Sequence, residues 1–272
     1  MYVGIDIGGT KTLVAVLNNE GVIEEQLKFP TKPSYPEFIE DLKATLAKLK
    51  TSDFKAGGLA IPAVKIDRKN GIGESYGNLP WHNTPVQHDI EQILNCPIAL
   101  DNDAKLAALS EAMLLKDQYK SVLYVTISTG IGYGLVIDGL IDENIGDGGG
   151  RTILLEHNGK MIPWEDFASG HAIVERYGKQ AKDINDDQTW KQICNDLAKG
   201  LVELIAITEP EVIVFGGSVG AYFEKYSHLL EESLNSYSVP LITMPRLIKA
   251  QRPEEAVVYG CYDLARLKFG AR

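Results

Sequence analysis

The chain has 272 residues, 44% of them apolar, with 27 Lys and Arg against 37 Asp and Glu, which gives a formal net charge of −10. This acidic balance argues against a nucleic-acid binder, because a phosphate backbone needs a basic protein face. Three scattered cysteines make no disulfide framework and no CxxC motif. No apolar run approaches the roughly 20 residues of a transmembrane helix, and the start lacks the segments of a signal peptide. We therefore expect a cytoplasmic protein with no nucleic-acid and no membrane partner.

The first half of the chain opens with short apolar runs separated by turn residues. Three of these runs predict an antiparallel meander of strands, over Tyr2–Ile7, Thr12–Leu17 and Val22–Lys28. Apolar residues at three- and four-residue steps then predict helices, and short apolar runs between them predict strands. In chain order these are a helix over Pro36–Leu49, a strand over Ala56–Ile61, a helix over Val86–Leu94, a strand over Ile98–Leu100 and a helix from Asp101–Asp103 to about Leu115.

The second half begins again with strands and then alternates. Strands are expected over Ser121–Ile127, Gly134–Ile137, Val212–Phe215 and Leu247–Ala250. Helices are expected over Trp164–Tyr177, Trp190–Thr208, Tyr222–Ser236 and Glu254–Leu267, with Pro253 suited to the first turn of the last one. Alternating strands and helices after an antiparallel start predict an α/β protein.

The two halves resemble each other at a constant offset. Tyr2–Ile5 matches Tyr124–Ile127, and Leu13-Val14 match Leu135-Val136, so that 124 − 2 and 135 − 13 both give 122. The match predicts a duplicated unit of strand, glycine turn and strand. The alternative is that any two apolar hairpins look alike.

The turn between the first two strands has the composition of an anion-binding site. Gly8 and Gly9 let the backbone approach a phosphate, while Thr10 offers a hydroxyl and Lys11 a cation. Asp6 offers a carboxylate that can hold Mg²⁺ through water. The alternative is an ordinary hairpin turn, and the spacing matches neither of the common nucleotide-binding glycine motifs.

Two further glycine turns follow buried strands in the second half. Thr129, Gly130 and Gly132 lie in the first of them, and Gly216-Gly217 end a strand, where ligands of α/β sheets bind. Three such turns predict one nucleotide held from several sides.

Asp103 is the candidate general base. It stands at a helix start after a buried strand, where the helix N-terminus keeps a carboxylate ionised and able to accept the proton of a substrate hydroxyl. Phosphoryl transfer needs little more than such a group, alignment and charge neutralisation. The alternative is that Asp101–Asp103 only cap the helix.

Four segments together resemble the ROK family of sugar kinases and related proteins, in family order and at family-like spacing. They are Asp6–Thr12, Asn102–Glu111, Ser128–Gly139 and Val214–Gly220. The resemblance implies an actin/hexokinase-like fold of two duplicated ribonuclease-H-like lobes around a central cleft, in which ATP-Mg²⁺ and a sugar meet. We expect an N-terminal lobe over residues 1–115, to which a last helix over 254–270 returns, and a C-terminal lobe over 116–253.

The resemblance also implies roles for single residues. It makes Asp103 the general base, and it makes Asn102, Asn78 and Glu165 sugar ligands. The phosphates would lie at Gly8–Lys11 and Ser128–Gly132, the nucleoside at Gly216-Gly217. A homodimer is expected on the same ground.

Two departures from the family pattern affect the sugar site. Family kinases carry a GExGH motif, whose Glu and His bind the sugar and a structural zinc, where this chain has Gly148–Thr152. Asp147 takes the place of that Glu only if this chain is aligned with the motif at a shift of one or two residues. The cysteine-rich zinc loop is absent, and we read His157 and His171 as non-ligands, so no zinc is expected.

The resulting hypothesis is an ATP-dependent, glucokinase-like enzyme that phosphorylates a hydroxyl of a hexose or hexose derivative. The alternative is a non-catalytic sugar-sensing regulator of the same family without a DNA-binding domain. Polyphosphate as the donor is disfavoured, because the chain has no basic track for a long polyanion.

Overall fold

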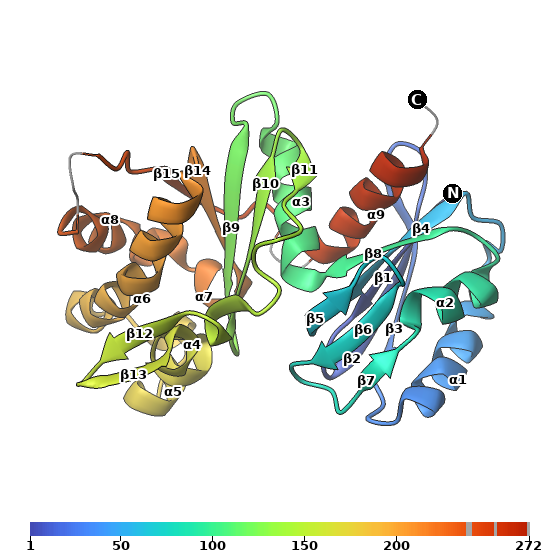
Figure 1. Ribbon diagram of the computed structural model, residues 1–272, viewed down its shortest axis with the longest axis horizontal. Coiled ribbons are helices and arrows are strands. Elements are labelled where there is room, and N and C mark those ends of the chain that lie inside the picture. The colour runs from blue at the N-terminus through green and yellow to red at the C-terminus, as the bar shows by residue number, and fades with distance from the viewer. Residues whose placement is uncertain (238–240, 253–254, 271–272) are drawn as a thin grey trace. The chain divides into compact units, whose positions relative to one another are not determined.

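The computed structural model describes residues 1–237, 241–252 and 255–270, which form two compact units (Figure 1). Unit 1 consists of Met1–Met113 together with Glu255–Arg272, and unit 2 of Leu114–Glu254. Among the described residues, no helix combines the length and the apolar character that crossing a membrane requires.

Unit 1 is built on a five-stranded sheet with the order β3-β2-β1-β4-β8 (Figure 1). Its strands are β1 (Tyr2–Ile7), β2 (Lys11–Leu17), β3 (Ile23–Pro30), β4 (Ala56–Ile61) and β8 (Ile98–Asn102). The first three strands run antiparallel, which confirms the predicted meander, and β4 and β8 are parallel to β1. Strand β4 is buried along its whole length, as expected for a short apolar run in the middle of a covered sheet.

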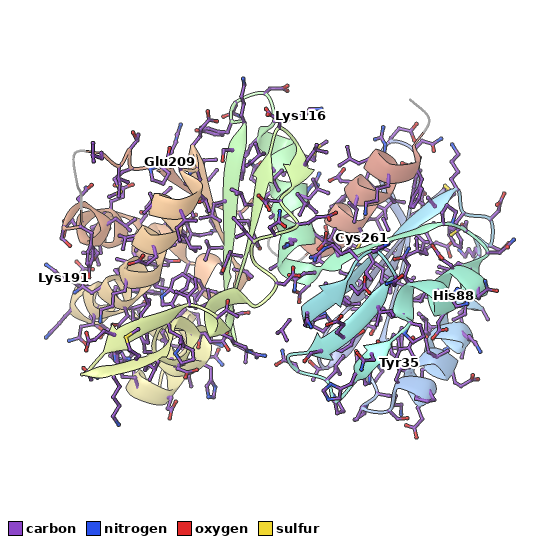
Figure 2. All side chains as sticks on the ribbon, viewed as in Figure 1. Tyr35, His88, Lys116, Lys191, Glu209 and Cys261 are labelled. Atoms are coloured by element: carbon purple, nitrogen blue, oxygen red, sulfur yellow. The ribbon has the colours of Figure 1, made fainter. Side chains whose placement is uncertain are left out.

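Helices cover both faces of this sheet. On one face, α1 (Tyr35–Leu46) and α2 (Val86–Leu94) bury Phe38, Leu42, Val86 and Ile90. On the other face, α9 (Ala256–Phe269) packs on β1 and β4 and buries Val258 and Tyr262 (Figure 1). Figure 2 labels Cys261 on this helix, and its thiol lies 3.6 Å from the carbonyl oxygen of Ile5. The expected start of α9, Pro253 and Glu254, lies outside the described residues.

A small second sheet in unit 1 is absent from the sequence predictions. It has the order β5-β6-β7, with β5 (Ala63–Asp67), β6 (Ile72–Tyr76) and β7 (His82–Thr84). Trp81 anchors it, because this buried indole packs against Tyr35, Phe38 and Tyr76 and donates a hydrogen bond to the carbonyl oxygen of Pro33 at 2.9 Å. The loop between β6 and β7, which carries Asn78, is therefore tied to the core of the unit.

Unit 2 has a second five-stranded sheet, with the order β11-β10-β9-β14-β15 (Figure 1). Its strands are β9 (Ser121–Ile127), β10 (Ile131–Ile137), β11 (Leu140–Ile141), β14 (Val212–Gly216) and β15 (Arg246–Lys249). Strand β9 pairs antiparallel with β10 and parallel with β14, as β1 pairs with β2 and β4. The long α6 (Asp187–Thr208) packs on α8 (Ser227–Asn235), and both bury leucine side chains in one core.

Two helices of unit 2 differ from the predictions. The helix expected over Trp164–Tyr177 is broken into α4 (Trp164–Ala168) and α5 (Gly170–Tyr177), because Ser169 adopts an extended conformation and its hydroxyl accepts a hydrogen bond from the N–H of Ala172. The helix expected over Tyr222–Ser236 is a short 3₁₀ turn (η3, Phe223–Lys225) followed by α8. Serine at the first break is a strong N-cap residue, which overrides the apolar periodicity there.

The segment between β10 and α4 holds a 3₁₀ turn and a hairpin. The turn is η1 (Gly149–Arg151), and the hairpin pairs β12 (Leu154–His157) with β13 (Lys160–Pro163). Asn158 and Gly159 both have positive φ, 52° and 78°, as two-residue hairpin turns require.

Candidate active site

The first glycine turn joins β1 to β2 and packs on the loop that carries Asn78. The N–H of Gly8 donates to the carbonyl oxygen of Lys11 at 3.0 Å, which closes the turn. A Cβ atom at Gly9 would lie 2.8 Å from the Cβ of Asn78, so glycine is needed there for close approach. Thr10 and Lys11 are exposed at its tip. The structure thus brings together a predicted phosphate turn and a predicted sugar ligand.

The junction of β8 with α3 (Asp103–Leu115) places Asn102 and Asp103. The buried Asn102 caps the helix, since its Oδ1 accepts the N–H of Ala104 at 2.9 Å and of Lys105 at 3.4 Å. Its Nδ2 donates to the carbonyl oxygen of Ala63 at 2.9 Å, leaving the second amide hydrogen for a ligand. Asp103 is the first helical residue, half-buried, and its Oδ1 accepts the N–H of Ala104 at 2.8 Å.

The carboxyl groups of Asp103 and Asp6 have raised pKa values. Burial raises the pKa of Asp103 to about 6, although the hydrogen bond from Ala104 lowers it. The expected ionising effect of the helix N-terminus is therefore outweighed by desolvation. Burial and then the charge of Asp103 raise the pKa of Asp6 to about 7, against the opposing charge of Lys28. A carboxylate with a pKa of about 6 is mostly ionised at pH 7, yet basic enough to accept a proton from a hydroxyl.

The second glycine turn joins β9 to β10 in unit 2 and is held by Glu165. The N–H of Ser128 donates to the carbonyl oxygen of Gly130 at 2.9 Å, and the N–H of Ile131 donates to Glu165 Oε2 at 3.2 Å. The other oxygen of Glu165 accepts from Arg151 Nε at 2.6 Å. Arg151 was not among the predicted residues, because nothing in the local sequence marks a contact made 14 residues away.

The second and third glycine turns meet beside one cavity of unit 2. Strand β14 lies next to β9, with Gly216 opposite Thr126. A cavity of 430 Å³ is lined by Ser128 and Thr129 from one turn, by Ser218 after Gly216-Gly217, and by His171, Gln180 and Tyr222. Gly217 has a φ of 78°, which favours glycine. Gln180 and Tyr222 were not singled out in the sequence, since they carry no motif, and His171 was considered only as a zinc ligand and read as a non-ligand.

The remaining predicted sugar ligand, Asp147, is half-buried just before η1. Burial and then the charge of Asp147 raise the pKa of Tyr133 on β10. η1 packs against β10, which carries Tyr133, and against α4, which carries Glu165. Gly132, on β10, is also half-buried in this region.

The β12–β13 hairpin is held by packing. The His157 ring stacks on the Phe167 ring, with centroids 4.3 Å apart, and its Nδ1 lies 3.6 Å from Asp196 Oδ1. Asp196 is also paired with Arg176 at 2.5 Å. Over the described residues, no group of three or more His, Cys, Asp or Glu side chains is arranged to hold a metal ion.

Comparison with known proteins gives the family. The ROK family model matches residues 2–268. The chain is 31% identical to N-acetylmannosamine kinase of Escherichia coli over 85% of its length and 87% of that protein, and 27% identical to a putative fructokinase of Bacillus subtilis over 87% and 84%. A ROK glucokinase from Streptomyces griseus, solved with glucose and AMPPNP, superposes with a TM-score of 0.80 at 22% identity, covering 98% of this chain and 99% of that one. A ROK hexokinase from Thermus thermophilus gives a TM-score of 0.76 at 26% identity, covering 98% of each chain. The protein therefore belongs to the ROK family and has its actin/hexokinase-like fold.

Proposed function

We propose that this protein transfers the γ-phosphoryl group of ATP to a hydroxyl of a hexose or hexose derivative, with Asp103 as the general base. That it is a sugar kinase follows from its family membership and from relatives named as kinases of glucose, fructose and N-acetylmannosamine. The base assignment rests on one observation: a half-buried carboxylate at the start of α3, with a pKa of about 6.

The Asp103 carboxylate accepts the hydroxyl proton as the hydroxyl oxygen attacks the γ-phosphorus. The bond from that phosphorus to the β,γ-bridging oxygen breaks, and ADP leaves. Asn102 keeps its cap on α3 during the step and offers its second amide hydrogen to the sugar. The proton acceptor therefore sits on a helix end that is fixed by the neighbouring side chain.

Each glycine turn is a proposed nucleotide contact within its own unit. The exposed Lys11 and the backbone of Gly8–Thr10 bind phosphate oxygens in this proposal, as do Thr129, Gly130 and Gly132. The 430 Å³ cavity beside Ser128 and Ser218 takes the adenosine. Asp6 fits a hard cation, because its carboxylate lies close enough to Asp103 for that charge to raise its pKa. Mg²⁺ held there would neutralise phosphate charge.

The proposed sugar ligands are Asn78 and Asn102 in unit 1, and Glu165 and Asp147 in unit 2. Glu165 is already paired with Arg151 on one oxygen and with Ile131 on the other. A sugar hydroxyl at Glu165 therefore donates to a carboxylate that Arg151 orients. Arg151 belongs to Gly148–Thr152, the segment that differs from the family's GExGH motif. Its pairing with Glu165 would therefore alter the sugar preference.

A coupled ADP-release assay tests the proposal, with glucose, N-acetylglucosamine, N-acetylmannosamine, mannose, fructose and allose as acceptors. ATP-Mg²⁺ is the donor in this assay. A separate arm measures sugar phosphate formed from polyphosphate, which releases no ADP, because one structural relative is named a polyphosphate/ATP glucomannokinase. We expect turnover with ATP and at least one sugar. Asp103→Asn should leave the fold intact and lower kcat by roughly 10²–10⁴-fold. Full activity in this variant would remove Asp103 as the base.

The second candidate function is a non-catalytic sugar sensor. The occupied Glu165 carboxylate and the changed motif at Gly148–Thr152 favour it. Folded protein that binds a sugar in calorimetry, yet releases no ADP with any acceptor, would establish this alternative.

A further inference from the structure

A buried ion pair links the small sheet of unit 1 to the end of β8. Arg68 follows β5, and its Nη2 and Nε lie 2.6 Å and 3.2 Å from the same oxygen, Oδ1, of Asp101. The side chains are 14% and 2% exposed. A carboxylate as buried as that of Asp101 needs a partner, because an uncompensated buried charge is strongly destabilising.

The same oxygen of Asp101 also holds the backbone that leads into α3. Oδ1 accepts the N–H of Asn102 at 2.7 Å. Asn102 in turn caps α3 through its own side chain, and Asp103 is the next residue. The guanidinium of Arg68 is therefore two hydrogen-bonded steps from the peptide that orients the proposed base.

The small sheet is attached to this junction at both ends of β5. At its first residue, the carbonyl oxygen of Ala63 accepts from Asn102 Nδ2, and just beyond its last residue Arg68 pairs with Asp101. Strand β6 pairs with β5, and the loop after β6 carries Asn78. The N–H of Gly77 in that loop donates to the carbonyl oxygen of Pro62 at 3.1 Å. The loop that carries Asn78 and the helix start that carries Asp103 are thus both attached to β5 and its two ends.

We propose that Arg68 is a positioning residue, which fixes the separation between the Asn78 loop and the Asp103 carboxylate through Asp101. The inference rests on the proposed function, because it assigns the geometry of the same base and sugar ligand. A bound hydroxyl reacts only when it lies within contact distance of its acceptor, and small displacements cost large factors in rate. Arg68 itself need not touch the substrate.

The test compares Arg68→Met with Arg68→Met/Asp101→Asn and with Leu42→Ala. The first variant leaves a buried carboxylate without its guanidinium, and the double variant removes that charge but keeps an oxygen for the N–H of Asn102. Leu42 is a fully buried α1 residue with no part in the Arg68–Asp101 pair, so its truncation is the control for lost stability alone. The readouts are thermal midpoint, kcat, and KM for sugar and for ATP.

We expect kcat to fall on the order of 10- to 100-fold in both Arg68 variants, with a raised KM for the sugar. The double variant should regain thermal stability without regaining kcat. Leu42→Ala should keep kcat near the parent value at a temperature where it is folded. Recovery of kcat together with stability in the double variant, or unchanged kcat in Arg68→Met, would overturn the inference.

Asp103→Asn, measured in parallel, separates this inference from the proposed function. An inactive Asp103→Asn beside a fully active Arg68→Met would refute only the role of Arg68. An active Asp103→Asn would refute the base assignment and, with it, the positioning role. Loss of kcat in Asp103→Asn and in both Arg68 variants, with Leu42→Ala unaffected, supports both.

Discussion

The charge of Asp103 contributes to the raised pKa of Asp6, so these two carboxyl groups of unit 1 compete for ionisation. One begins α3 and the other lies near the end of β1. Burial is the larger cause for both groups. In the absence of a bound cation, ionisation of both Asp6 and Asp103 therefore destabilises the folded protein.

Asp6→Asn should stabilise the protein at high pH in the absence of Mg²⁺. The pKa of Asp6 is raised from 3.8 to about 7, so the folded protein binds this proton more tightly than the unfolded chain does. Its contribution to stability is present below about pH 4 and is lost as the pH rises towards 7. Melting curves at pH 4 and pH 8 should show the variant more stable than the parent only at pH 8. A lower midpoint at pH 8 would contradict the burial of this charge.

The pH dependence of kcat/KM for the sugar should show an acid limb near pH 6. Protonation of Asp103, whose pKa is about 6, removes the proton acceptor, so the rate falls about tenfold for each pH unit well below that value. Raising the Mg²⁺ concentration should move the limb to lower pH, because a nearby cation favours ionised carboxylates. Initial rates at sugar concentrations well below KM, between pH 5 and 8, measure this limb. A profile that stays flat down to pH 5 would be incompatible with Asp103 as the base.

Arg151→Ala and Glu165→Ala should affect different substrates. Loss of Arg151 frees one oxygen of Glu165 but leaves the bond to Ile131, so only the KM for the sugar should change. Loss of Glu165 also removes the acceptor of the Ile131 N–H beside the second glycine turn, so the KM for ATP should rise as well. Hydrogen bonds to charged groups contribute about 1.5–3 kcal/mol, which corresponds to roughly 10- to 100-fold in KM. Identical changes in both variants would show that Glu165 does not support the turn.

Gly217→Ala should weaken ATP binding, with Gly159→Ala as its control. Both residues have a φ of 78°, and a left-handed conformation costs a non-glycine residue about 1–2 kcal/mol. A Cβ at Gly217 would also lie 2.5 Å from the carbonyl oxygen of Ile127, whereas nothing lies within 4 Å of one at Gly159. We expect similar φ strain in both, an additional clash in Gly217→Ala, and a raised KM for ATP only in Gly217→Ala. Equal KM values would place the nucleotide elsewhere.

Removal of zinc should leave the thermal midpoint unchanged. The β12–β13 hairpin is held by the stacking of His157 on Phe167, and all three cysteines are buried as free thiols. Treatment with a strong zinc chelator followed by calorimetry tests this, and Phe167→Ala should lower the midpoint. A lower midpoint after chelation would mean that a metal orders this segment.

The sequence predicted the elements that local pattern determines. The meander of unit 1 and the strands before each glycine turn follow from short apolar runs, and the structure has them. The sheet of β5, β6 and β7 was missed because its strands are short and carry polar side chains on exposed faces. Its strongest anchor, Trp81, acts through aromatic contacts with α1, which no local pattern records.

The candidate site divides in the same way. Glycine turns and a polar helix start are local signals, so Gly8, Gly9 and Asp103 could be proposed from the sequence. Arg68 and Arg151 have no such signal, because each acts on a carboxylate that only the folded chain brings near. The raised pKa of Asp103 could not be predicted from the sequence either, since desolvation depends on which groups surround the carboxyl group in the folded chain.

Helix α9 returns to unit 1 after the whole of unit 2 has been traversed, and this sets the order in which the chain can fold during synthesis. Unit 2 is one continuous segment and can complete its core as soon as it has left the ribosome. Unit 1 cannot complete its core until α9 has been synthesised. Until then, the face of β1 and β4 that Val258 and Tyr262 cover stays exposed. The proposed base and the first phosphate turn therefore belong to the part of the molecule that is finished last.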